Sequence, residues 1–241
     1  MFKKLVLTAA LLAASSANAD TITQWNFNSV PADTSTATGT TAANIGTGVI
    51  SLLNGVTNPS FNSGVGSSDT SLAANNSGFQ TTTYAAQGAG NNTRGVQYNV
   101  STVGFEDILV KYDLRHSNTS SRYEQFQYTI DGANFIDFAL FDGNVGDAWF
   151  NNRSVDLSSV DGVNNNANFA FRVVATFAPG ISTYLPSNAS SSYGGTTSGT
   201  WRFDNVIVSG TTVAAVPEPE TYALLVAGLG FVGFSARRKA V

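Results

Sequence analysis

The chain has no cysteine, a single histidine and few charged residues. Without cysteine, disulfide scaffolds, thiolate metal sites and cysteine nucleophiles are excluded, so the fold must depend on core burial and sheet hydrogen bonds. One histidine also excludes a multi-histidine metal site. Any histidine-dependent catalysis would need His116, which we expect in an exposed loop beside Ser117 and Asn118.

Charge is sparse, with Asp, Glu, Lys and Arg making up 12% of the residues, and it is unevenly distributed. Five of the 12 basic residues and two of the 16 acidic residues lie outside residues 20–215, which leaves 7 against 14 and a net charge of −7 in that range. Such a surface does not bind nucleic acid through phosphate neutralisation. Nor does it lie on anionic lipid.

No long amphipathic helix is predicted between residues 20 and 215. Short segments of alternating apolar and polar residues, bounded by Gly, Asn, Asp and Ser, predict strands instead. These segments are residues 22–27, 49–53, 79–84, 96–100, 108–114, 126–130, 135–141, 169–175 and 201–208. Residues 29–90 are of low complexity and predict loops and short edge strands. The pattern is typical of an all-β fold, an antiparallel β-sandwich of jelly-roll type, with residues 20–215 as one exported domain.

In the last strand segment the apolar residues change from odd-numbered to even-numbered positions. Trp201 and Phe203 face one side, whereas Val206 and Val208 face the other side of a regular strand. A β-bulge near Asn205 would bring all four apolar side chains onto one face.

The acidic residues do not predict an active site. A glycosidase needs two carboxyl groups ~5–10 Å apart, and the exported domain has only Glu106 and Glu124 as glutamates. Asp113, Asp137 and Asp204 alternate with apolar residues, so we expect them to face solvent. We therefore expect no catalytic residues, no enzyme and no cofactor.

Calcium ligands are a separate question. Asp131-Gly132, Asp142-Gly143 and Asp161-Gly162 could supply oxygen ligands, but turn chemistry also explains each of them. A structural calcium built from separate loops is left open, with no ligands assigned.

Three aromatic residues lie among Gly, Asn and Ser, where a binding loop could stack them on sugar rings. They are Trp149, Tyr184 and Tyr193. Packing over one end of the sandwich is the competing interpretation, and it is the one we favour.

The N-terminus predicts a signal peptide over residues 1–19. Lys3 and Lys4 precede an apolar stretch, and Ala17 and Ala19 form a small-x-small cleavage site. We expect signal peptidase to cleave between Ala19 and Asp20.

The C-terminus has three parts in a fixed order. The motif Val216-Pro217-Glu218-Pro219 is stiff and extended because each proline restricts the residue before it. Residues 222–236 carry no charge and predict a short transmembrane helix. Arg237, Arg238 and Lys239 favour a cytoplasmic C-terminus.

Residues 216–241 resemble the PEP-CTERM sorting signal, also described as an ice-binding-protein-type C-terminal domain. The resemblance implies export across the inner membrane of a Gram-negative bacterium, transient anchoring there, and recognition by an exosortase. It also implies a final place at the cell surface or outside the cell, often in bacteria that make exopolysaccharide. The order of predicted strands and turns from Leu114 to Gly132, together with Arg202 to Val206, resembles that of concanavalin-A/LamG-like sandwiches of surface proteins.

The sequence therefore predicts an exported, surface-sorted, non-catalytic protein. Its expected role is a structural or adhesive component of the cell envelope or exopolysaccharide matrix. One alternative is a lectin-like carbohydrate-binding module that uses Trp149, Tyr184 and Tyr193, and a third is a glycan hydrolase. The expected partners are signal peptidase, an exosortase and exopolysaccharide.

Overall fold

A computed structural model describes residues 19–213 of the chain. These residues form eleven β-strands and, in this range, no helix. The strands are β1 (Asp20–Trp25), β2 (Val49–Leu52), β3 (Thr57–Ser63), β4 (Ser77–Thr82), β5 (Gly95–Asn99), β6 (Phe105–His116), β7 (Tyr123–Thr129), β8 (Ile136–Asp142), β9 (Ala148–Asp156), β10 (Ala170–Thr176) and β11 (Trp201–Thr212).

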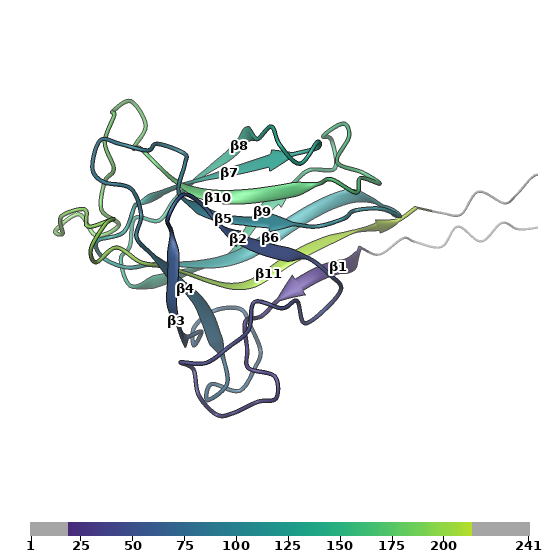
Figure 1. The fold of residues 1–241 in the computed structure, drawn as a ribbon, viewed down its shortest axis with the longest axis horizontal. Helices are drawn as coiled ribbons and strands as arrows, with labels where there is room; N and C mark the ends of the chain where they lie inside the picture. Colours follow the sequence, from purple (N-terminus) through teal and green to yellow (C-terminus); the bar gives the residue numbers. More distant parts are fainter. Residues whose placement is uncertain (1–18, 214–241) are drawn as a thin grey trace, which may run out of the picture.

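The strands form two antiparallel sheets that pack as a sandwich (Figure 1). Sheet A has the order β3-β4-β11-β6-β9, with β1 also paired to β11, and sheet B has the order β2-β5-β10-β7-β8. The predicted all-β sandwich is confirmed. Within residues 19–213, no helix has the length and hydropathy needed to span a bilayer. The expected transmembrane segment, residues 222–236, lies outside the described residues.

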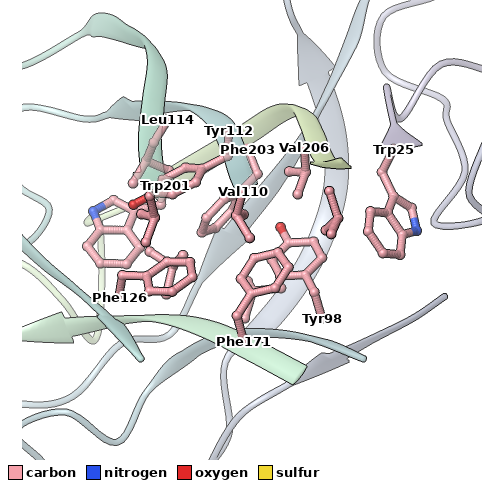
Figure 2. Packing of buried hydrophobic residues seen from close by; sticks show 14 of the residues in the cluster. Trp25, Tyr98, Val110, Tyr112, Leu114, Phe126, Phe171, Trp201, Phe203 and Val206 are labelled. Atoms are coloured by element: carbon pink, nitrogen blue, oxygen red, sulfur yellow. The ribbon is translucent and has the colours of Figure 1, made fainter. Parts of the chain in front are cut away.

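The core lies between the sheets and is rich in aromatic rings (Figure 2). Tyr98 of β5 stacks on Phe171 of β10 with ring centroids 4.8 Å apart, and Phe126 of β7 stacks on the same ring at 5.3 Å. Trp25 of β1 and Phe203 of β11 approach Tyr98 from sheet A. Each of these side chains is fully buried. Burial of a large aromatic side chain stabilises a fold by ~2–3 kcal/mol, so this cluster holds the two layers together.

The predicted bulge in the last strand is confirmed. The pairing of β11 with β6 shifts register between Asp204 and Ile207, and Asn205 has a positive φ of 43°. As a result, Trp201 and Phe203 before the bulge and Val206 and Val208 after it are all fully buried.

Two strands were not predicted from the sequence. β3 is polar, contains Pro59 and lies at the edge of sheet A, where a proline can be accommodated. β9 lies at the opposite edge of that sheet and mixes Arg153, Asn151 and Ser154 with its apolar residues. Trp149 therefore lies in a strand, and the binding loop suggested for it is wrong.

The two ends of the described chain lie side by side. Asp20 at the start of β1 pairs with Gly210 near the end of β11, so the first and last strands run side by side in sheet A (Figure 1). Within the described range, the strands of both sheets and the core cluster belong to residues 20–213. Residues 20–213 thus supply both layers and the core between them, so we expect this fragment to fold by itself.

Candidate functional site

A buried group of charged side chains bridges the two sheets. Glu124 of β7 faces His116 of β6, with Oε2 and Nε2 2.8 Å apart. Its other oxygen, Oε1, lies 2.9 Å from Nε of Arg153 on β9. The side chains of His116 and Glu124 have no exposed surface, and that of Arg153 is 16% exposed. We call these three residues the interlayer triad.

His116 has an acceptor at each ring nitrogen. Nδ1 lies 2.8 Å from the Ser121 carbonyl oxygen, and Nε2 faces the Glu124 carboxylate. Both ring nitrogens therefore have a partner inside the protein. The expectation of an exposed loop histidine is wrong, because the side chain points inward from the end of β6 and packs edge-on against Trp201 and Phe150.

The interlayer triad is closed to substrate. Arg153 also donates from Nη2 to the Asp142 carbonyl oxygen at 2.7 Å, and its guanidinium lies over the rings of Phe141 and Phe150. Nearby, burial raises the pKa of the Tyr112 hydroxyl well above its usual value, and the Glu124 charge raises it further. The arrangement stabilises the packing of β7 against β6 and β9, and it leaves no open face for a reacting molecule.

A second group of polar residues lies on the outer face of sheet A. Residues 64–77, here called the covering segment, fold over that face. Trp149 Nε1 donates to the Val65 carbonyl oxygen at 3.0 Å, and Asn151 Nδ2 donates to the Gly66 carbonyl oxygen at 2.8 Å. Asn205 Nδ2 donates to Ser68 Oγ at 2.7 Å. The covering segment is therefore attached to both β9 and β11.

The covering segment buries two carboxylates that we expected in solvent. Asp113 and Asp204 point outward from sheet A, as their parity predicts, but they are 1% and 0% exposed. The expectation is wrong for both, because the outer face is occupied by chain. Only Asp137 of the three acids is exposed.

Backbone and hydroxyl donors surround the two buried acids. Asp113 Oδ1 accepts from the Asn152 amide at 2.7 Å, and Asp204 Oδ2 accepts from Ser67 Oγ at 2.7 Å. Burial raises the pKa of the Asp204 carboxyl to about 8, and the charges of Asp69 and Asp113 add to the increase. The hydrogen bonds from Ser67 and Asn205 oppose it.

The structure separates the three aromatics suggested as glycan contacts. Tyr184 and Tyr193 stack on each other with ring centroids 4.7 Å apart, whereas Trp149 lies beside the covering segment. Tyr184 is 1% exposed and donates from its hydroxyl to the carbonyl oxygen of Gly90 at 2.9 Å. Its ring is therefore not available to a sugar. Burial raises its pKa to about 12.

The outer face of sheet B carries a row of polar residues that sequence reasoning missed. One residue from each strand lies in register across the sheet: Ser51, Gln97, Arg172, Gln127 and Asp137. Arg172 donates from Nε to Gln127 Oε1, and Gln127 donates from Nε2 to Asp137 Oδ1. The Arg172 guanidinium also lies 4.1 Å from the centre of the Phe135 ring. We call this set the polar row.

A family model of the PEP-CTERM protein-sorting motif matches residues 215–239. This match supports export and sorting to the cell envelope of Gram-negative bacteria, with an exosortase as the processing partner. No curated protein is significantly similar to the chain.

The residues of both sorting signals lie almost entirely outside the described range. This applies to Ala17, to Val216, Pro217, Glu218 and Pro219, and to Arg237, Arg238 and Lys239. Ala19 and Asp20 are described, and both are exposed at the start of β1.

Proposed function

We propose that the protein is a non-catalytic structural or adhesive component of the cell envelope or exopolysaccharide matrix. The observation that supports this best is the position of the chain ends. Asp20 pairs with Gly210, and the sorting motif begins at residue 215. A tail attached at this end would leave the outer face of sheet B and the opposite end of the sandwich free to meet other molecules.

The chemistry of the domain also favours a non-catalytic role. His116 is the sole histidine, and Glu124 is one of two glutamates in the exported domain. Each is committed to the other inside the interlayer triad. A general acid or base must reach a substrate proton, which an enclosed pair does not do.

Matrix fractionation of a deletion strain tests the proposal. We expect the wild-type protein in the surface or extracellular fraction, and we expect loss of the gene to weaken matrix cohesion or cell attachment. Complementation with the wild-type gene should restore both properties. An unchanged matrix and unchanged attachment in the deletion strain would argue against the proposed role.

The polar row favours a lectin-like module as the second candidate function. Planar amides and a guanidinium supply donors and acceptors that suit sugar hydroxyls, and Phe138 nearby is 42% exposed. Binding of residues 20–213 to a glycan array, lost in Arg172→Ala and kept in Trp149→Ala, would support this alternative. No binding by the wild-type domain would eliminate it.

A hydrolase would contradict both candidates. The host's own exopolysaccharide is the substrate to try, with release of reducing ends as the readout. If Glu124→Gln stays folded but loses this activity, the enclosed pair of His116 and Glu124 must be accessible to substrate.

A further inference from the structure

Three carboxylates lie together beneath or within the covering segment. Asp113 and Asp204 are direct partners in the pairing of β6 with β11, and like charges in that arrangement repel each other. The charge of Asp69 adds to the field at Asp204. Among residues 19–213, the ion pairs use Glu124, Asp142 and Asp147 and none of these three acids.

The side-chain oxygen of Asn76, which has no hydrogen-bond partner, lies close to the carboxylate of Asp204. Asn76 is 3% exposed, and its Oδ1 has no hydrogen-bond partner, while its Nδ2 donates to the Asp69 carbonyl oxygen at 3.4 Å. A Cβ atom on Gly64 would lie 1.8 Å from Asn76 Oδ1 and 2.5 Å from Asp204 Oδ2. These distances limit the separation of the two oxygens to about 4.3 Å. When Asp204 is ionised, two acceptors therefore face one another with no donor between them.

A proton, a cation or a flip of the Asn76 amide relieves such a contact. A buried acceptor without a donor is destabilising, and a buried carboxylate without a counter-charge more so. The oxygens at this point are a carboxylate, an amide carbonyl and, through Ser67 Oγ at 2.7 Å from Asp204 Oδ2, a hydroxyl. All three are hard ligands of the kind that calcium accepts in an irregular shell.

We propose that Asp204, Asn76 and Ser67 form a calcium-binding site between the covering segment and sheet A. Within the described residues, no three acidic, histidine or cysteine side chains are arranged around a metal position. The proposed site therefore depends on one carboxylate, with the amide and the hydroxyl, and the charges of Asp69 and Asp113 strengthen the attraction. The role that follows is structural: calcium would fix residues 64–77 on the sheet. This inference does not depend on the proposed function.

The test measures thermal unfolding of residues 20–213 after removal of metals with EDTA. Calcium sites of extracellular modules have Kd values of about 10⁻⁴–10⁻³ M, so ~10 mM calcium should raise Tm by roughly 3–10 °C. Asp204→Asn should abolish the saturable rise. Asp107→Asn makes the same charge change at an exposed position and should keep it.

A second variant keeps the test informative if Asp204→Asn unfolds. Asn76→Asp adds a carboxylate to the proposed shell, so it should lower Tm in EDTA and tighten calcium binding several-fold. Equal concentrations of magnesium control for ionic strength. If Asp204 instead holds a proton that it donates to Asn76, calcium leaves the wild-type Tm unchanged, and the proposal is wrong. An equal calcium response in wild type and Asp204→Asn would overturn it as well.

Discussion

Replacement of Glu124 by Gln should be among the most destabilising single changes in this domain. The carboxylate lies 2.8 Å from His116 Nε2 and forms an ion pair with Arg153, whose Nε at 2.9 Å makes no hydrogen bond, and it has no exposed surface. A glutamine keeps the shape, but it removes the charge and turns an N–H₂ group toward one of the two nitrogens. Removal of one partner from a buried ion pair costs about 3–5 kcal/mol.

That loss is large compared with the stability of a domain. Native domains have a free energy of unfolding of about 5–15 kcal/mol, so Glu124→Gln would remove a fifth or more of the total. For a domain of this size, the change corresponds to a fall in Tm of roughly 6–20 °C. Urea denaturation followed by circular dichroism measures the free energy directly, provided that the slope with denaturant concentration is unchanged.

Asp142→Asn provides the matched control. Asp142 and Arg122 form a two-pronged pair at 2.6 and 2.7 Å, but their side chains are 40% and 26% exposed. A solvent-screened pair contributes about 0–1 kcal/mol, so this variant should unfold close to wild type. If Glu124→Gln loses no more stability than Asp142→Asn, the reasoning about the interlayer triad is refuted.

A triple replacement separates charge from packing. His116→Phe, Glu124→Leu and Arg153→Met together remove every charge of the interlayer triad and retain most of its volume. Apolar replacement of a complete buried ion group is often close to neutral. The triple variant should therefore lose less stability than Glu124→Gln alone.

Three further predictions follow from the fold and the tail. Replacement of Pro217 and Glu218 by Ala should leave the protein membrane-retained and unprocessed, and normal release in cell fractions would refute the sorting assignment. Asn205→Val should destabilise the domain by about 1–2 kcal/mol more than Asn205→Gly in urea denaturation, because φ is positive at the bulge; equal losses would contradict this. Burial raises the pKa of the core tyrosines above the usual 10.0, so their contribution to stability is present below pH 10 and is lost as the pH rises beyond it, by about 1.4 kcal/mol per tyrosine and pH unit. Phenolate absorbance should accordingly appear together with unfolding, and gradual ionisation of a folded domain would contradict the burial. The tyrosines concerned are Tyr84, Tyr98, Tyr112, Tyr184 and Tyr193.

The sequence predicts the strands whose two faces differ in polarity. In β5 and β10 the inward rows of Val96, Tyr98, Phe171 and Val173 are fully buried, as their alternation indicates. The parity change in β11 even locates the bulge at Asn205. These features are local, because each depends on residues within a few positions of one another.

The missed features depend on contacts between distant residues. The parity of Asp113 and Asp204 correctly places them on the outer face, but only the folded chain shows that residues 64–77 cover it. His116 and Glu124 belong to different sheets, so their pairing follows from the stacking of the layers. No local pattern carries that information.

The central claim is that this chain is exported and that its tail directs its sorting. Cell fractionation with mass spectrometry of both mature termini tests it most directly. We predict an envelope or extracellular protein that begins at Asp20 and ends before residue 222. Recovery of the intact chain from Met1 to Val241 in the cytoplasm would contradict the account.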